Sequence, residues 1–558
     1  METQSAAEIL REKREALLRD WAISSDPAQR FTLKKQIEET EADLARLSGA
    51  PPGGADAGRP SVDLSHLPAG AEHFLGRGPE LAALAAARTP GSGIAVVEVI
   101  APGGTGKTAL IKRWLEAQRP VGNGAGWGGA SQVYGWSFYS QGTGDDRQAS
   151  EDQFLAAAIA RFGVAIEGSA NPADKGQALA DQLCTGSTLL ILDGCEPLQY
   201  PPGPLAGELR APGLKTLLTQ LAAVGHPGLC VVTSREWLQD LGEWVRTPAN
   251  PRGPVMRLDL GNLSETDGAR LLHARGATRA GAAPIAADDT ELREASRAFD
   301  GHALSLALLG RYLARARGGD IRQRDAVDPA RSDRDARGHA ARVIIAYETW
   351  FAREARAGSA PAARALTALH LLGYFDRPAA PDLLAALRAA PPIAGLTEPL
   401  QDLSTDDWTL TVRDLADCGL IHWDPAQVDA ARSDPHADAL DAHPLVREHL
   451  AAALAARDPA AWREGHRRLY ERLKDSAPHR PDGLEGLQPL YQAVAHGCLA
   501  GLWEDACVAV YHDRIMRGTG HDGFYNVKKL GAFGADLGAV ACLFAEPWSR
   551  PAPALTQV

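Results

Sequence analysis

Five short apolar runs, separated by segments with helical spacing, constrain the fold of this chain more than any other feature. The runs are continuous in apolar character and do not alternate with polar residues. A strand buried on both faces produces this pattern, and such strands occur in parallel sheets covered by helices. The sequence therefore predicts an α/β domain with a parallel sheet. The runs are GIAVVEVI (93–100), QVYGWSFYS (132–140), STLLILDG (187–194), GLCVVTSRE (228–236) and PVMRLDL (254–260).

The first run is followed at once by APGGTGKTAL (101–110), which matches the phosphate-binding pattern G-x-x-x-x-G-K-[ST] except that Ala101 replaces the first glycine. A strand, a glycine-rich turn and a helix start direct several backbone N–H groups at one anion. In this pattern Lys107 reaches the β- and γ-phosphates and Thr108 ligates Mg²⁺. A methyl group at Ala101 is tolerable if φ stays negative. The alternative is a glycine-rich turn that binds nothing. The predicted binding residues of the loop are Pro102, Gly103, Gly104, Thr105, Gly106, Lys107, Thr108 and Ala109.

Two later runs end in charged residues. Asp193 ends LLILD, where a carboxylate can hold Mg²⁺ across from Thr108. Glu196, three residues later, is a candidate to orient or deprotonate the attacking water. In VVTSRE, Arg235 is a candidate for a bidentate contact with the γ-phosphate. A simple turn after a strand and a surface arginine are the alternatives. The predicted catalytic set is thus Lys107, Asp193, Glu196 and Arg235, with Thr108 and Asp193 on the metal.

In this order the motifs resemble those of the STAND class of P-loop NTPases, the NB-ARC- and NACHT-like signal-transduction ATPases. HFLGRGPELAAL (73–84) resembles the entry motif of that class, FDGHALSLALLGRYL (299–313) the G-x-P-L motif of its helical domain, and LDAHPLVREHL (440–450) its winged-helix histidine motif. Ala303 stands where the family has proline. The resemblance implies ATP or ADP with Mg²⁺ as cofactors. It also implies that Phe74, Gly76 and Arg77 lie by the adenine and that His443 lies near the β-phosphate of bound ADP.

The segments VYGWSFYSQG, DGCEPLQYPPG and LHLLGYFDRP are similar to those of a bacterial subgroup that carries tetratricopeptide repeats after the NTPase. Residues 487–515 are consistent with one such repeat, and a second helix pair is expected at 526–546. Because repeat arrays need about three units to bury a continuous core, either this tail packs on the NTPase body or the chain is a shortened version of a longer relative.

Periodicity, composition and the resemblance together divide the chain into six parts. The winged-helix-like part contains two strand-like stretches, GLIHWD and ALDAHP. The parts are a helical hairpin (1–48), a flexible Gly/Pro-rich linker (49–69), the P-loop NTPase domain (70–260), a helical region (261–385), a winged-helix-like domain (386–456) and a TPR-like helical region (457–558).

Composition narrows the class of protein and its partners. A formal net charge of −12 gives no global attraction for nucleic acid or anionic lipid, so neither is an expected partner. The seven cysteines include no C-x-x-C pair and indicate reduced core thiols. No apolar stretch approaches the ~18 residues that a membrane-spanning helix needs, and the first residues lack the apolar region of a signal peptide. We therefore expect a cytoplasmic protein.

The resemblance implies a nucleotide-dependent switch that rests closed with ADP and opens on ATP with Mg²⁺. Opening would produce a homo-oligomer, with the hairpin recruiting a protein effector and the C-terminal helices receiving the trigger. Hydrolysis would be slow, because the reaction resets the switch, and bacterial defence is one expected setting. The alternatives are a turnover P-loop ATPase or kinase, and a nucleotide-binding scaffold with a degenerate site.

Overall fold

The computed structural model describes residues 60–68, 73–120, 126–141, 150–279, 281, 284–327, 336–423, 439–546 and 549–555. The chain divides into two units, 1–60 and 61–558, and every element below belongs to the second. The predicted hairpin (1–48) lies outside the described residues, as does most of the predicted linker. No helix in the described ranges is long and apolar enough to cross a membrane. Five of the seven cysteines are buried, as predicted for core thiols, whereas Cys184 and Cys507 are half-buried.

A six-stranded sheet with the order β1-β3-β4-β5-β2-β6 forms the centre of the α/β domain. Every neighbouring pair of strands is parallel, which confirms the predicted parallel sheet. Each of the five predicted runs contains one strand. The strands are β1 (Ser61–His66), β2 (Val96–Ile100), β3 (Gln132–Ser137), β4 (Thr188–Asp193), β5 (Leu229–Ser234) and β6 (Val255–Asp259).

The predicted linker (49–69) is wrong in part, because residues 61–66 within it form strand β1 of the sheet. Ser61–His66 pairs in parallel with β3 at the edge of the sheet, with Val62 opposite Val133. Only alternate residues of this strand are apolar, and Leu64 packs against the core beneath the sheet. An edge strand needs no continuous apolar run, because part of it stays in contact with solvent. The sequence pattern therefore places this short strand in the linker, because its alternating residues follow directly after Gly/Pro-rich residues.

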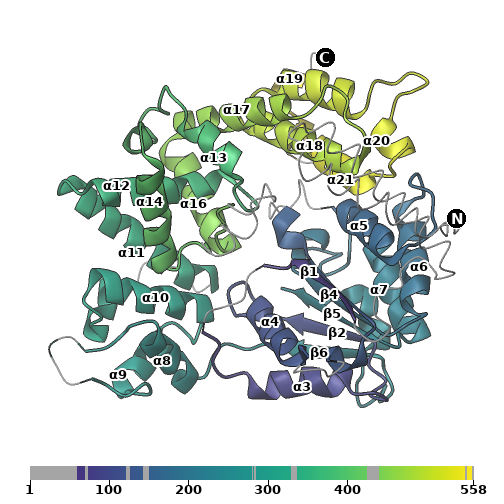
Figure 1. Cartoon of the computed structure of the whole chain (residues 1–558), viewed down its shortest axis with the longest axis horizontal. Coiled ribbons are helices and arrows are strands. Elements are labelled where there is room, and N and C mark those ends of the chain that lie inside the picture. Colours follow the sequence, from purple (N-terminus) through teal and green to yellow (C-terminus); the bar gives the residue numbers. More distant parts are fainter. Residues whose placement is uncertain are drawn as a thin grey trace, which may run out of the picture. The chain divides into compact units, whose positions relative to one another are not determined.

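The sheet is covered on both faces by helices, and β2 shows why a strand of this sheet carries apolar residues on both of its faces. Val97 and Val99 lie in one hydrophobic cluster with Leu110 of α4, whereas Val96 lies in a second cluster with Leu217 of α7. Successive strand residues point to opposite faces, so both sets are buried. Figure 1 shows the two groups of helices on either side of the strands. They are α3 (Gly78–Arg88) and α4 (Lys107–Gln118) on one face, and α5 (Asp152–Phe162), α6 (Pro172–Leu183) and α7 (Pro212–Val224) on the other.

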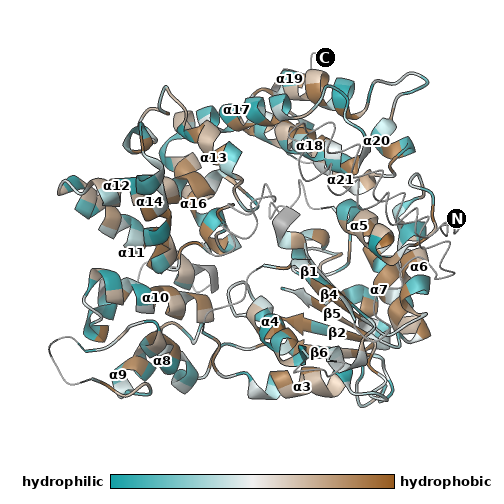
Figure 2. Cartoon of the chain, in the orientation of Figure 1, coloured by the Kyte–Doolittle hydropathy of each residue, from teal (hydrophilic) through white to brown (hydrophobic). Residues whose placement is uncertain are grey.

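Helices dominate after the sheet, and one hydrophobic cluster runs through them from α8 to α21. Each helix carries both hydrophobic and hydrophilic residues (Figure 2). Ser264 caps α8, because its side chain accepts a hydrogen bond from the N–H of Asp267. The helices are α8 (Glu265–Ala274), α9 (Thr290–Ala298), α10 (Ala303–Ala316), α11 (Ala336–Arg356), α12 (Ala360–Leu371), α13 (Pro381–Arg388), α14 (Thr405–Asp417), α16 (Pro444–Arg457), α17 (Pro459–Ser476), α18 (Gly483–Leu499), α19 (Trp503–Asp505), α20 (Tyr525–Lys528) and α21 (Phe533–Cys542).

The two strand-like stretches near the winged-helix-like part form only isolated bridges. His422 pairs with Asp441, and Ala379 pairs with Leu440, each in antiparallel fashion. The apolar residues of these stretches, including Leu420, are buried in the helical cluster. Their hydrophobicity therefore serves the helical core and does not build a sheet.

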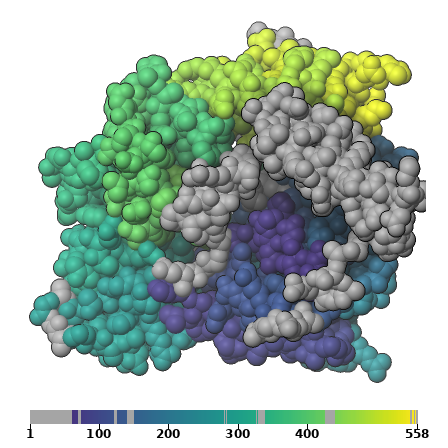
Figure 3. Space-filling model, in the orientation of Figure 1, coloured from purple at the N-terminus to yellow at the C-terminus, as the bar shows by residue number. Residues whose placement is uncertain are grey.

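The C-terminal tail packs against the α/β domain, which is the first of the two predicted alternatives. Asp152 Oδ2 at the start of α5 accepts a hydrogen bond of 2.8 Å from the N–H of Ala535 in α21. Lys175 Nζ of α6 donates to the carbonyl of Leu530 over 2.9 Å. Figure 1 shows α21 beside α5, and in Figure 3 the yellow surface of the tail continues the green surface of the preceding helices.

The tail differs in part from the predicted repeats. Residues 487–515 hold two packed helical segments as expected, α18 and then α19 continued by a π-helix (Ala506–Ile515). The expected second pair at 526–546 is replaced by short α20, ten-residue α21 and the strand β7 (Phe544–Glu546), which pairs with β8 (Arg550–Pro551). The docked face of α21 lies on the α/β domain, so a second long helix is not required to cover it.

Candidate functional site

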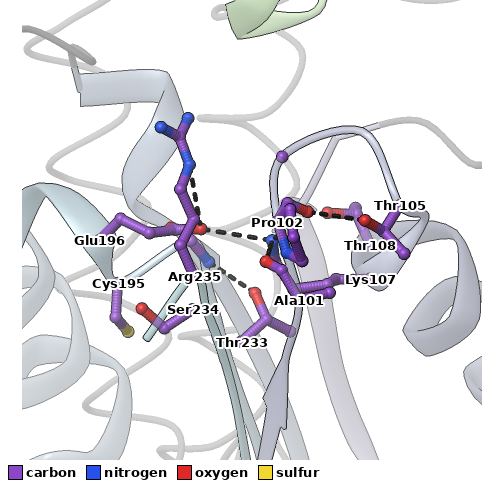
Figure 4. Close-up of polar contacts among 12 residues, drawn as sticks. Ala101, Pro102, Thr105, Lys107, Thr108, Cys195, Glu196, Thr233, Ser234 and Arg235 are labelled. Carbon is purple, nitrogen blue, oxygen red and sulfur yellow. Dashed lines mark hydrogen bonds and ion pairs between the residues drawn. The ribbon is translucent and has the colours of Figure 1, made fainter. Parts of the chain in front are cut away.

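The sheet order brings the predicted site residues to one edge. Strands β4, β5 and β2 are neighbours and run in parallel, so their carboxyl ends meet. Asp193 ends β4, Arg235 follows β5, and the glycine-rich loop follows β2. In open parallel sheets, ligands bind at this end of the strands. Figure 4 shows residues from all three segments around a common centre.

Ala101 fits the loop without backbone strain. Positive φ angles occur at Gly104 (79°) and Gly106 (108°), and Ala101 is not among the described residues with positive φ. Its N–H donates to the carbonyl of Ser234 over 3.2 Å, and the residue is buried. The φ angle of Ala101 is therefore not positive, which is the condition under which an alanine can replace the first glycine of the pattern. The loop ends at Lys107, where α4 begins.

Lys107 is turned back onto its own loop. Its Nζ donates to the carbonyl oxygens of Ala101 and Pro102 over 2.7 and 3.3 Å. The same nitrogen lies 3.4 Å from Oε1 of Glu196, and only 6% of the residue is exposed. Thr105 Oγ1 also donates to the carbonyl of Pro102, over 3.0 Å. The loop thus surrounds one buried ammonium group, which is a suitable partner for an anion.

Thr108 and Asp193 are in direct contact, as their predicted shared role requires. Thr108 Oγ1 lies 3.0 Å from each carboxylate oxygen of Asp193. Thr233 Oγ1 donates to Oδ1 of Asp193 over 2.7 Å and accepts from the N–H of Gly194 over 2.8 Å. Burial raises the pKa of the Asp193 carboxyl, and the hydrogen bonds from Thr233 and Thr108 oppose part of that rise. Sequence reasoning missed Thr233, although it stands two residues before Arg235.

These oxygen donors suit a magnesium ion. Mg²⁺ prefers oxygen ligands, and at phosphate sites it is held by one or two protein groups together with phosphates and waters. The hydroxyl of Thr108 and the carboxylate of Asp193 supply such a set. Within the described residues, no group of three or more His, Cys, Asp or Glu side chains could hold a metal alone. The residues present therefore fit a metal that shares its coordination with a bound phosphate.

Glu196 lies between two cations. Its Oε1 is 3.4 Å from Lys107 Nζ and 3.7 Å from Arg235 Nε, and it accepts a 2.6 Å hydrogen bond from the hydroxyl of Tyr139. Oε2 is buried and has no hydrogen-bond partner in the part of the chain that the structure describes. In Figure 4, dashed lines join both Lys107 and Arg235 to this carboxylate.

Tyr139 is a second residue that sequence reasoning missed. Burial and the neighbouring Glu196 raise the pKa of its phenol well above the ordinary value, so it remains a hydrogen-bond donor. Gly194 has φ of 73°, and a Cβ there would lie 2.3 Å from the Tyr139 ring. The glycine of the D-G turn is therefore needed for the approach of this ring. The sequence gives no spacing rule that links the two positions.

Helix α16, from the C-terminal part of the chain, also contacts the glycine-rich loop and Arg235. Arg235 Nη2 lies 3.6 Å from Oε1 of Glu448, and a Cβ placed on Gly103 would lie 3.5 Å from the methyl groups of Leu445. His443 caps this helix, because its Nδ1 accepts from the N–H of Leu445 over 3.2 Å. Burial, together with cations that include Lys107, lowers the pKa of His443 to about 3, so its ring is neutral at pH 7.

The entry motif contacts the loop from a third direction. Arg77 Nη2 donates to the carbonyl of Thr105 over 3.2 Å. Gly76 has φ of 68°, and a Cβ there would lie 2.9 Å from Oδ2 of Asp267. Phe74 packs against the cluster beneath the sheet. The structure therefore brings Arg77 to the glycine-rich loop, whereas Gly76 lies beside Asp267 of α8 and Phe74 lies against the hydrophobic cluster.

Comparison with known proteins adds little to this geometry. No protein-family model matches the chain, and no curated protein matches it. One similar solved structure is that of the Aeropyrum pernix ORC2 protein (ADPNP-ADP complexes), with 15% sequence identity and a TM-score of 0.29 over 70% of this chain and 98% of that chain. A TM-score of this size does not establish a shared fold. What the chain itself shows is a parallel α/β core in which a glycine-rich loop joins β2 to α4, followed by helices.

Proposed function

We propose that the loop 101–108 binds ATP or ADP with Mg²⁺ and that the chain is a nucleotide-dependent switch of the STAND class. One observation carries the proposal: α16 contacts the phosphate loop through Leu445 and the γ-phosphate candidate Arg235 through Glu448. A nucleotide in the loop would be enclosed between the sheet edge and this distant helix. A ligand shifts a conformational equilibrium only by its different affinity for the two states. Contacts that depend on the γ-phosphate would supply that difference.

In this site different residues would bind the phosphates, the metal ion, the attacking water and the base. Lys107 would hold the β- and γ-phosphates, and Thr108 and Asp193 would hold Mg²⁺, which supplies positive charge to the phosphates. Glu196 would orient the attacking water, and Arg235 would contact the γ-phosphate. A larger group would bind the base and the β-phosphate of ADP. It comprises Phe74, Gly76 and Arg77 by the adenine and His443 at the β-phosphate in the closed form.

Slow hydrolysis follows from the position of Glu196. Tyr139 and Lys107 both engage its Oε1, which leaves only Oε2 to orient the attacking water. A switch that resets by hydrolysis does not need rapid turnover. We therefore assign the reaction to resetting, in the cytoplasm, and not to making a product.

The remaining parts would pass the signal. In the proposed arrangement the winged-helix-like residues 386–456 hold the closed form, and the TPR-like residues 457–558 receive the trigger. Opening exposes surfaces for homo-oligomerisation, and the clustered residues 1–48 recruit a protein effector by avidity. Bacterial defence or regulation is the setting that the motif resemblance favours.

The test begins with purified full-length protein. Bound nucleotide is identified by mass, binding of MgADP and MgATP is titrated, and particle size is measured with ADP and with a non-hydrolysable ATP analogue. Lys107→Ala and Asp193→Asn should abolish nucleotide-dependent changes. Arg113→Ala is the matched control, because Arg113 is an exposed cation on the same helix α4. The proposal fails if particle size ignores nucleotide in the wild type. A kcat above about 1 per second would instead indicate a turnover ATPase, and absence of any nucleotide binding would indicate a scaffold.

A further inference from the structure

We propose that His302, together with the backbone of Leu304, is a positioning residue that clamps the phosphate loop from the helical region and aims its N–H groups at bound phosphate. The inference rests on the proposed nucleotide site and adds to it His302, which occupies the variable position of the G-x-P-L-like segment. His302 lies immediately before α10, in the segment FDGHALSL. It is almost fully buried, with 1% of its surface exposed.

Three consecutive carbonyl groups of the loop accept hydrogen bonds from outside it. His302 Nε2 lies 2.9 Å from the carbonyl oxygen of Gly103, across 199 residues of sequence. The N–H of Leu304 donates to the carbonyl of Gly104 over 3.0 Å. Arg77 Nη2 donates to the carbonyl of Thr105 over 3.2 Å. Two of these three bonds thus come from the helical region.

The direction of each carbonyl fixes the direction of the next N–H. In a trans peptide the C=O and N–H groups point to opposite sides. Holding the oxygens of Gly103, Gly104 and Thr105 outward therefore directs the N–H groups of Gly104, Thr105 and Gly106 inward. An anion site needs such converging N–H groups and is weakened by a carbonyl that faces the anion. In the described loop these three N–H groups donate to no backbone carbonyl, so they are available to a ligand.

Capping of α10 selects the tautomer of His302 that this clamp needs. Nδ1 accepts from the N–H of Ser305 over 3.4 Å and lies 2.6 Å from its hydroxyl. A neutral imidazole that accepts at Nδ1 carries its proton on Nε2. Burial lowers the pKa of His302, which favours this neutral form. The ring therefore accepts from the helix with one nitrogen and donates to the phosphate loop with the other.

Gly104 allows the close approach of the ring. A Cβ at Gly104 would lie 2.7 Å from Cε1 of His302 and 3.1 Å from Cβ of Leu304, and its φ is 79°. The glycine thus serves both the turn and the contact with the helical region. Two of the three hydrogen bonds to the loop carbonyls come from His302 and Leu304, at the start of α10. Movement of that helix away from the loop would therefore break them and free the carbonyls of Gly103 and Gly104.

Two substitutions separate the clamp from the helix cap. In His302→Asn the amide oxygen takes the position of Nδ1 and keeps the cap, but no donor reaches Gly103. In His302→Gln the terminal N–H group reaches the position of Nε2 and keeps the donor, while the cap is weakened. Dissociation constants for MgADP and for adenosine are measured by calorimetry, together with the midpoint of thermal unfolding.

We expect His302→Asn to bind MgADP about five- to tenfold more weakly, since one hydrogen bond is lost, with adenosine binding and the unfolding midpoint nearly unchanged. His302→Gln should bind MgADP about as the wild type does but unfold earlier. Wild-type affinity in His302→Asn, with the wild type binding MgADP, overturns the clamp and leaves the proposed function intact. Equal weakening in both variants, accompanied by lower midpoints, also overturns it, because the role would then be structural. A wild type that binds no MgADP overturns the proposed function itself.

Discussion

Oε1 of Glu196 lies 3.4 Å from Nζ of Lys107, so the candidate catalytic carboxylate and the phosphate-loop lysine form an ion pair across the site. Arg235 Nε approaches the same oxygen at 3.7 Å. In the proposed switch a γ-phosphate needs these two cations, and the carboxylate competes with it for both. Glu196 would therefore oppose ATP binding before it assists hydrolysis.

The charge of Glu196 gives the first prediction. Glu196→Gln should bind a non-hydrolysable MgATP analogue about three- to tenfold more tightly, because a negative charge beside the phosphates is removed. Hydrolysis should fall about a hundredfold or more, the usual loss when a general base is removed. Both are measured on the same preparation, by calorimetry and by phosphate release. Tyr139→Phe, which keeps the charge and loses one hydrogen bond, is the control. Weaker analogue binding by Glu196→Gln would contradict the competition.

The contact between Arg235 and Glu448 gives the second prediction, on the stability of the closed form. The pair joins the edge of β5 to α16 and is partly exposed, so it is worth up to about 1 kcal/mol. Glu448→Gln should therefore open at about two- to fivefold lower concentration of the ATP analogue. Light scattering against analogue concentration measures the shift. Glu354→Gln, a surface carboxylate paired with Arg353, should behave as the wild type. A higher required concentration would show that the pair favours the open form.

Docking of the tail gives the third prediction. The carboxylate of Asp152 accepts from the N–H of Ala535 and from the hydroxyl of Ser150. Asp152→Ala leaves these buried donors without a partner, at a cost of about 1–3 kcal/mol. Hydrogen exchange over α21 should accelerate, while exchange in β2 stays as in the wild type. Lys175→Met removes one donor to the carbonyl of Leu530 and should give a smaller increase. Unchanged exchange in α21 in both variants would show that other contacts hold the tail.

Buried histidines give the fourth prediction, on acid stability. Burial lowers the pKa of His226 to about 4, of His496 to about 4 and of His443 to about 3. A histidine whose folded pKa lies below the unfolded value near 6.5 stabilises the fold above that pH, and this stability is lost as the pH falls. Each should lose about 2 kcal/mol between pH 6.5 and pH 5. Glu151, whose pKa is raised to about 7 by burial, acts in the opposite direction, since its contribution is lost as the pH rises through 7.

The midpoint of thermal unfolding, measured at pH 7.5, 6.0 and 5.0, checks this sign. We expect these three histidines to lower the midpoint on acidification, whereas buried carboxyls with raised pKa values, Glu151 and Asp193 among them, oppose that fall. His226→Gln keeps a donor for the carbonyl of Thr188, which His226 Nε2 contacts at 3.0 Å, and removes the titrating group. Its midpoint should fall less steeply. The same slope in His226→Gln as in the wild type would contradict the assignment of this ring as neutral in the folded protein.

The sequence by itself determined five of the six strands of the sheet and the turn after β2. Continuous apolar runs have one simple meaning, burial on both faces, and the runs that end at Ile100, Asp193 and Ser234 became neighbouring parallel strands. The loop could also be predicted from the sequence, because its conformation depends on glycines at positions with positive φ, such as Gly104 and Gly106, and not on distant residues. Strand β1 could not be predicted in the same way, since an edge strand buries only part of its side chains and its hydrophobic pattern is therefore weak.

Only the tertiary structure decided which side chains surround the loop. Tyr139 on Glu196, Thr233 on Asp193 and His302 on Gly103 join positions that are distant in sequence and that no spacing rule connects. Such contacts depend on how whole helices pack, and packing is set by the combined burial of many residues and not by any local pattern. The sequence therefore predicted a glycine-rich loop between a strand and a helix, whereas the residues that contact the loop and its neighbours depend on the tertiary structure.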